Sequence, residues 1–163
     1  MNKLTNNFRM KQGSTLFLKG VVLLIGLIVL AICVFALPPL IVSEKVGDYR
    51  PIFLGLYVPA IPFFFALYQA LKLLGHIDKN EAFSELSVKA LKNIKYSAVT
   101  ISALFAAGMP YIFYAAEQDD APGVVAIGLI IIFASLVIAT FAAVLQKLLQ
   151  NAAEIRSEND LTV

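Results

Sequence analysis

The side chains that could carry out acid–base chemistry lie close together in one polar segment of the chain. His76 is followed by Asp78, Glu81 and Glu85, and a histidine beside carboxylates can act as a general base. The sequence has a single histidine and a single cysteine, Cys33, which lies far away inside an apolar run. These residues are too few for a Cys/His metal site, so we expect no metal and no cofactor. We interpret His76 as a polar residue at an interface.

Other signatures of catalysis are missing from the sequence, and we expect no catalytic residues. It contains no P-loop, no dinucleotide-binding glycine pattern and no nucleophile elbow. Residues 72–95 carry five lysines, but three acids dilute them and no groove-reading module accompanies them. We therefore expect no direct binding of nucleic acid. Membrane lipid, through its anionic headgroups, is the natural partner of these lysines.

Long apolar runs must position all of these polar groups. They cover residues 21–42, 51–74, 97–116 and 124–145, and Lys72 is the one charged residue inside them. A helix of about 20 apolar residues crosses a bilayer core of about 30 Å. The chain is 60% hydrophobic and 15% charged, whereas soluble domains are about 45–50% apolar and about 25% charged. We predict an all-α integral membrane protein, a four-transmembrane-helix bundle forming a single membrane domain over residues 1–163.

The basic residues predict how the chain is oriented. Eleven of the thirteen lie in residues 1–20, 72–95 and 147–163, on alternate sides of the spans. The positive-inside rule then places both termini in the cytoplasm. The expected spans are residues 15–42, 51–74, 95–116 and 122–146, with a cytoplasmic helix at 80–94 and a cytoplasmic tail at 147–163.

Prolines and small residues predict the shape of the spans. Pro38 and Pro39 are expected to disturb the outer end of the first span, and Pro110 to bend the third. In the second span, Pro59 and Pro62 predict a kink, and neighbouring helices must satisfy the carbonyls that it frees. We favour a static bend over a hinge or cavity wall. Small residues of the fourth span predict a close helix contact at Ala134, Ala139, Ala142 and Ala143.

An alternative function is a small transporter or channel subunit, which would have to form a homo-oligomer to enclose a path. It predicts a water-accessible route near Pro59, Pro62 and Gln69. No span carries a central charged residue, whereas proton-coupled carriers and ion pumps need such groups. For this reason we rank transport below the binding of a partner.

Two amphipathic stretches outside the spans are candidate docking surfaces. Gly75 predicts the end of the second helix, and Asn80 or Ser84 the N-cap of the next. Glu85 and Lys89 are spaced as a helical ion pair. The apolar candidates for docking a partner are Phe83, Leu86, Leu91, Ile94, Leu148, Leu149 and Ile155. The competing interpretation is that the two stretches pack on each other and cap the bundle.

Two segments resemble a known family. They are residues 75–91, which begin GHIDKNEAFS, and residues 144–163, which end ENDLTV. With four spans, they resemble the YoaS-like bacterial membrane proteins (domain of unknown function 2975), which implies a location in the inner membrane of a bacterium. The resemblance brings no activity or catalytic residue. Members are often encoded beside a small helix-turn-helix regulator, which implies a membrane protein that binds or sequesters a cytoplasmic transcription regulator.

Overall fold

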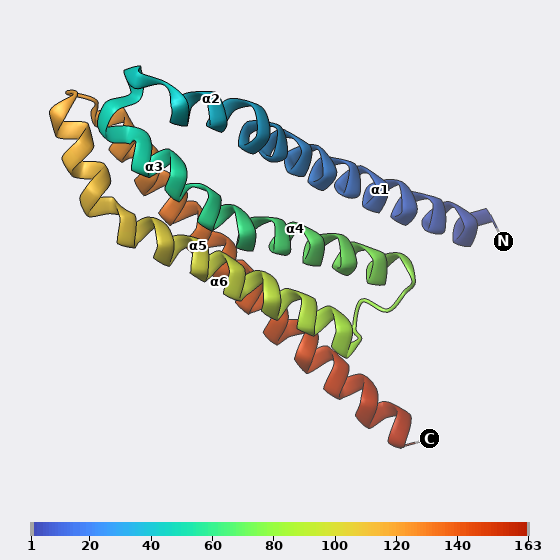
Figure 1. Ribbon diagram of the computed structural model, residues 1–163. Helices are drawn as coiled ribbons and strands as arrows, with labels where there is room; N and C mark the ends of the chain where they lie inside the picture. The colour runs from blue at the N-terminus through green and yellow to red at the C-terminus, as the bar shows by residue number, and fades with distance from the viewer. Residues whose placement is uncertain (1, 163) are drawn as a thin grey trace.

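The computed structural model describes residues 2–162, which are almost entirely helical (Figure 1). In chain order the elements are α1 (Asn2–Ala31), the π-helical turn η1 (Ile32–Ala36), α2 (Leu37–Val42), the 3₁₀ helix η2 (Glu44–Tyr49), α3 (Arg50–Gly55), α4 (Tyr57–Asp78), α5 (Glu85–Gln118) and α6 (Pro122–Leu161). Among the described residues, four helical stretches are long and apolar enough to cross a membrane: Asn2–Val42, Glu44–Asp78, Glu85–Gln118 and Pro122–Leu161.

The long helices extend well beyond what a bilayer requires. The 40 residues of α6 correspond to a rod of about 60 Å, twice the thickness of a hydrocarbon core. The first helix starts at Asn2, earlier than the predicted residue 15. The predicted tail from residue 147 continues α6 without a break to Leu161. The polar ends of these helices therefore project past the apolar segments.

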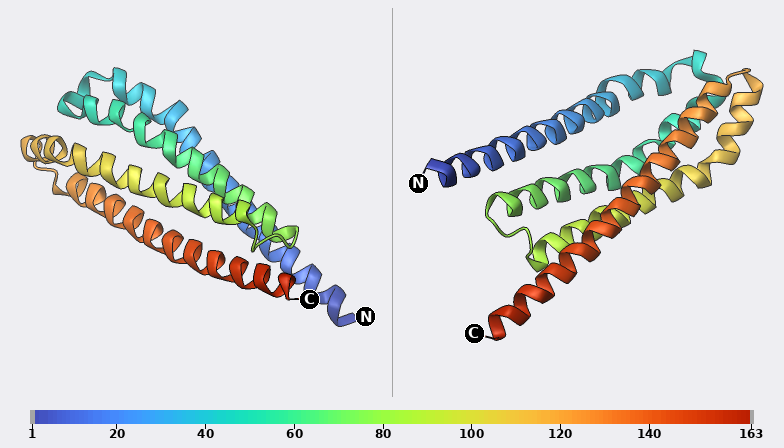
Figure 2. Two further views of the ribbon diagram at one scale, coloured as in Figure 1. Left: turned by 90° about the horizontal axis from the view of Figure 1, so that it is seen from below. Right: turned by 180° about the vertical axis from the view of Figure 1, so that it is seen from behind.

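The helices pack in chain order as an open row (Figure 1, Figure 2). α1 packs on α4, α4 on α5 and α5 on α6, and the α5–α6 contact is the most extensive. α1 and α6 form the two ends of the row and do not pack extensively on each other. The four predicted helices are present, and they form an open row with α1 and α6 at its ends. Lipid solvates apolar helix faces as well as protein does, so closure is not required.

The π-turn η1 lies just before Pro38 and Pro39, and the first span is therefore disturbed before its outer end. Within η1 the backbone N–H of Leu37 bonds to the carbonyl of Ile32, one residue further back than in an α-helix. The prolines have no N–H, so the carbonyl of Cys33 finds no donor in its own helix. The Tyr57 hydroxyl of α4 donates to that carbonyl at 2.8 Å, as expected when a neighbouring helix satisfies a freed group.

The second span is interrupted at Leu56, between α3 and α4. Pro59 cannot donate to the carbonyl of Gly55, which explains a break one turn before the proline. Pro62 lies inside α4, which stays helical. α5 contains Pro110, and Figure 1 shows α5 curving toward its C-terminal end. The second span thus departs from a regular α-helix one turn before Pro59, while the backbone of Leu56 stays in the helical region.

The connection between α4 and α5 differs from the prediction. α4 runs through Gly75 to Asp78, so Gly75 is not its stop. Asn80, at a φ of 59°, is the left-handed residue after the helix: its N–H bonds to Ile77 and that of Glu81 to His76, the Schellman arrangement. Ser84 is the N-cap of α5. The predicted helix at 80–94 therefore begins at Glu85 and is continuous with the third span.

Candidate functional site at the charged end of the helices

Both termini and the α4–α5 connection lie at one end of the molecule (Figure 1). We call it the charged end, because most of the basic residues belong to the segments that meet there. α1, α4, α5 and α6 all reach this end. The candidate functional groups of the chain are therefore brought together by the antiparallel packing of its long helices.

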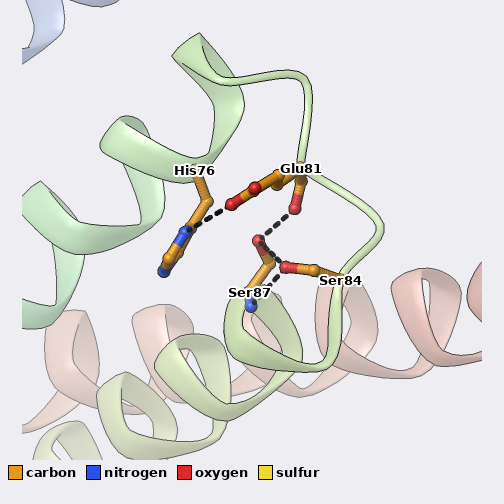
Figure 3. A network of polar contacts seen from close by, with 4 residues as sticks. All are labelled: His76, Glu81, Ser84 and Ser87. Carbon is orange, nitrogen blue, oxygen red and sulfur yellow. Dashed lines mark hydrogen bonds and ion pairs between the residues drawn. The ribbon is translucent and has the colours of Figure 1, made fainter.

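A polar network holds the α4–α5 connection (Figure 3). Nδ1 of His76 lies 3.6 Å from the Glu81 carboxylate. The hydroxyl of the fully buried Ser87 donates to the Glu81 backbone carbonyl at 3.0 Å. Ser84 Oγ accepts from the Ser87 N–H at 3.4 Å. Ser87 thus bonds to a backbone carbonyl and not to the histidine, so these four residues shape the turn and form no nucleophile–base pair.

An ion pair fastens α1 to the end of α4. The Lys19 ammonium donates to the Asp78 carboxylate, and together with the side chain of the buried Thr15 it lowers the pKa of Asp78 below its usual value. Sequence reasoning missed this pair because its members are 59 residues apart. One feature of the sequence could have indicated the pair. The first two spans are joined by a short loop and must be antiparallel neighbours, which places the charges at their inner ends side by side.

A groove of about 850 Å³ lies between the start of α5 and the projecting part of α6. We call it the α5–α6 groove. Its lining residues are Phe83, Ser84, Glu85, Val88, Lys89, Lys92, Asn93, Tyr96, Gln146, Gln150, Ala153, Glu154 and Ser157. The two ion pairs between described residues are Lys19–Asp78 and His76–Glu81. The predicted pairing of Glu85 with Lys89 is therefore not formed, and the lysines of the groove keep their charge unneutralised.

At the membrane-facing end of the groove, a lysine, a glutamine and a tyrosine are in contact. Lys95 Nζ donates to Gln146 Oε1 at 3.1 Å, which joins α5 to α6. The same ammonium lies 4.9 Å from the centre of the Tyr96 ring, and the Lys92 ammonium lies 6.0 Å from it. Both are within the range of a cation–π contact. Positive charge therefore gathers around Tyr96.

Phe83 lies where several segments of the charged end meet. It lines the α5–α6 groove and two adjoining cavities of about 530 and 480 Å³. The larger of the two reaches the end of α6 at Leu161, and the smaller reaches α1 at Leu18. Its side chain is nevertheless exposed. Among the predicted docking residues, Phe83 is thus the one that lines cavities shared with α1, α5 and the end of α6.

The structure does not gather the seven predicted docking residues into one surface. Leu91 is buried, with 4% of its surface exposed, so it belongs to the packing of the row. Ile94 and Leu149 are half-buried. Leu148 and Ile155 are 59% and 61% exposed, and they lie about half a turn away from the α6 residues that line the groove. Leu86 is also exposed.

The positions predicted for a transport path are also separated. Pro59 lines an apolar cavity of about 220 Å³ between α3–α4 and α5, near the end opposite to the charged one. Pro62 is half-buried in α4, and Gln69 is buried without lining that cavity. Within residues 2–162, no three His, Cys, Asp or Glu side chains are grouped to hold a metal ion.

Comparison with known proteins identifies the family. The model of a protein family of unknown function, DUF2975, matches residues 16–163. The uncharacterized membrane protein YoaS of Bacillus subtilis (strain 168) is 58% identical over 166 residues, covering 94% of this chain and 100% of that protein. No solved structure matches the chain. The chain therefore belongs to the DUF2975 family, as residues 75–91 and 144–163 indicated.

Proposed function

We propose that this chain is a non-enzymatic protein of the bacterial inner membrane that binds a cytoplasmic protein partner through the projecting part of α6. In this proposal both termini and the α4–α5 connection face the cytoplasm, as the positive-inside rule predicts. The observation that carries it is the exposure of Leu148 and Ile155, at 59% and 61%. Both lie beyond the apolar run that ends at Leu145, on a part of α6 exposed to water.

The two side chains have the spacing of a helical recognition surface. Seven residues are about two turns, so Leu148 and Ile155 project from the same side of α6. Anchors at this spacing are typical of helices that dock into an apolar groove. Fully burying one Leu or Ile side chain contributes about 1.5–3 kcal/mol, so two anchors supply a substantial part of the affinity of a transient complex.

The family resemblance suggests which partner to expect. A small helix-turn-helix regulator held at the membrane would be withheld from DNA, so the chain would act by sequestration. The membrane protein itself then needs no nucleic-acid-binding module, which agrees with its dispersed lysines. Lys147 and Arg156 flank the two anchors in the sequence and would steer an acidic docking surface on such a regulator.

Co-purification from detergent extract tests the proposal. The probe is the helix-turn-helix regulator that the family resemblance leads us to expect beside the gene, co-expressed with the full-length chain. Leu148→Glu and Ile155→Glu are each expected to weaken its retention at least tenfold, because each removes an anchor and adds a charge. Gln150→Glu is the matched control: it introduces the same side chain on the groove side of α6.

Thermal unfolding of each purified variant distinguishes docking from packing. The proposal requires that Leu148→Glu and Ile155→Glu unfold at the same temperature as the unmodified protein. If either substitution lowers the unfolding temperature of the protein, or if the variant proteins still retain the regulator, the docking function is wrong. Loss of the regulator with the Gln150→Glu control as well would move the contact to the α5–α6 groove.

A further inference from the structure

We propose that the α5–α6 groove binds the phosphate headgroup of an anionic phospholipid from the leaflet next to the charged end. The groove's volume of about 850 Å³ is within the range of small-molecule sites, about 300–1,000 Å³. This inference is independent of the partner proposed above. It uses the side of α6 that carries Gln146 and Gln150, whereas Leu148 and Ile155 project from the other side.

Charge is distributed unevenly along the groove. Lys92 lines its membrane-facing part, and the Lys95 ammonium contacts two lining residues there, Gln146 and Tyr96. The carboxylates of the lining lie nearer the other end: Glu85 is ten residues before Lys95, and Glu154 is eight residues after Gln146. Because Lys95 and Gln146 are in contact, Lys92 is about 4–5 Å from their level along the helix axis and the two carboxylates are about 12–15 Å from it. An anion beside Gln146 therefore lies nearer to two cations than to either carboxylate of the lining.

The hydrogen-bond donors at this end suit a phosphate ester. Because Gln146 Oε1 accepts from Lys95, the amide NH₂ of Gln146 is the group left to face a ligand. Lys92 forms no ion pair with any described residue, and its ammonium has three donors. Lys92 and Gln146 come from different helices, and both line the groove. A phosphate oxygen between them would complete the bonding of both.

The depth of the site identifies a lipid rather than a soluble ester. After Lys95 the next charged residue of α5 is Glu117, so the apolar segment starts directly above Tyr96. Lysine and tyrosine at such a boundary lie at headgroup level. Lys92, Tyr96 and Val99 follow one another at spacings of four and three, on one side of α5. Val99 is 45% exposed, which leaves apolar surface for the acyl chain attached to the bound phosphate.

Fluorescence quenching by brominated lipid tests this site in the full-length protein. The chain has no tryptophan, so Val99→Trp introduces a single reporter beside the expected acyl chain. The variant is reconstituted in mixtures of phosphatidylcholine and phosphatidylglycerol, with bromine on the acyl chains of one lipid at a time. The ratio of the two association constants is expected to favour phosphatidylglycerol about 25-fold, because each of the two lysines near the surface contributes about a factor of five.

Charge-removing variants assign the preference to the groove. Lys92→Gln and Lys95→Gln, each in the Val99→Trp background, are each expected to lower the ratio about fivefold. Lys92→Arg, which keeps the charge, is expected to retain the full preference. So is the matched control Lys147→Gln, because among the described contacts Lys147 neither lines the groove nor touches Gln146 or Tyr96. Higher salt should reduce the preference, because the interaction is electrostatic.

Three outcomes would overturn the inference. One is equal quenching by the two lipids before any lysine is changed, and another is a preference that stays at its full value in both glutamine variants. The third is loss of the preference when inorganic phosphate is added in excess at constant ionic strength, which would assign the groove to a soluble phosphate ester. Circular dichroism of the variants, with Lys92→Arg as the folded reference, shows whether a lost preference reflects a lost site.

Discussion

The hydrogen bond from Tyr57 to the backbone of Cys33 compensates for a local defect in the first span. The two prolines after Leu37 remove donors that the carbonyls of the preceding turn would otherwise use. In a hydrocarbon environment no water replaces them. One hydroxyl on α4, placed 2.8 Å from the Cys33 carbonyl, therefore stabilises both the π-turn and the contact between the first two spans.

Replacing Tyr57 by Phe tests this account. The substitution keeps the ring and leaves the Cys33 carbonyl unsatisfied, which costs about 1–3 kcal/mol. We expect a lower unfolding temperature in detergent and an unchanged helix content by circular dichroism. Tyr114→Phe is the matched control, because Tyr114 is exposed. Equal stability of the two variants would show that the hydroxyl of Tyr57 contributes nothing.

Individual residues also show what the sequence could not predict at the charged end. Ser84 was recognisable as an N-cap because its hydroxyl serves a local backbone N–H. Asn80 was ambiguous, since the same residue type caps helix starts and adopts the left-handed conformation after helix ends. Lys19 and Asp78 carried no local signal, because their pairing depends on how two distant helix ends align.

At the scale of the elements, the contact between α5 and α6 depends on small residues. Gly128, Ser135, Ala139 and Ala142 are buried and recur along one side of α6. A side chain at Gly128 would place a Cβ 2.9 Å from the Met109 sulfur of α5. Ala139 and Ala142 were predicted correctly as contact residues. Ala134 was not, since it is exposed: helical rotation separates it from Ala139 by more than a quarter turn.

Leucine substitutions at two alanines of α6 should therefore differ in effect. Ala139→Leu inserts three heavy atoms into the α5–α6 contact and is expected to destabilise the protein by about 1–3 kcal/mol. Ala134→Leu adds the same atoms on a face that lipid covers, and is expected to be near neutral. Unfolding in detergent compares the two. If both variants melt alike, the buried face of α6 has been assigned incorrectly.

The spans were predictable as elements because length and apolar composition alone determine whether a helix can cross a bilayer. The positions of their breaks were less predictable. A proline disturbs the turn before it, and the structure accommodates Pro38 and Pro39 by a π-turn but Pro59 by a break at Leu56. Which of these occurs depends on the donors that a neighbouring helix offers, which a single chain's sequence does not display.

At the scale of the whole molecule, the row leaves most apolar side chains on its outside. Exposed phenylalanines occur along α1, η1 and α6, including Phe17, Phe35, Phe133 and Phe141. In water such surfaces would aggregate, whereas lipid solvates them. Hydropathy identified the apolar helices but not which of their sides contact another helix, because an apolar residue is equally compatible with lipid and with protein. For this reason the order of helices was not predictable, and the row was not expected.

Orientation is the prediction that belongs to the whole molecule. We expect green fluorescent protein fused after Val163 to fluoresce, since it folds in the cytoplasm. Alkaline phosphatase inserted at Gly47, in the turn between α2 and α3, should be active, since it requires the periplasm. The positive-inside rule gives both results. An inactive phosphatase insertion together with a non-fluorescent C-terminal fusion would show the opposite orientation, with the charged end outside the cell.

The π-turn in the first span has a consequence for its geometry. A π-turn contains one residue more than an α-turn, and each residue of an α-helix advances the direction of its side chain by about 100°. The part of the span after Ile32–Ala36 is therefore rotated relative to the part before it. The first part packs on α4, and α2 packs on α3. One extra residue thus allows a single span to pack against two helices, α4 and α3. Removing that residue would rotate the buried Leu37 away from its present neighbours.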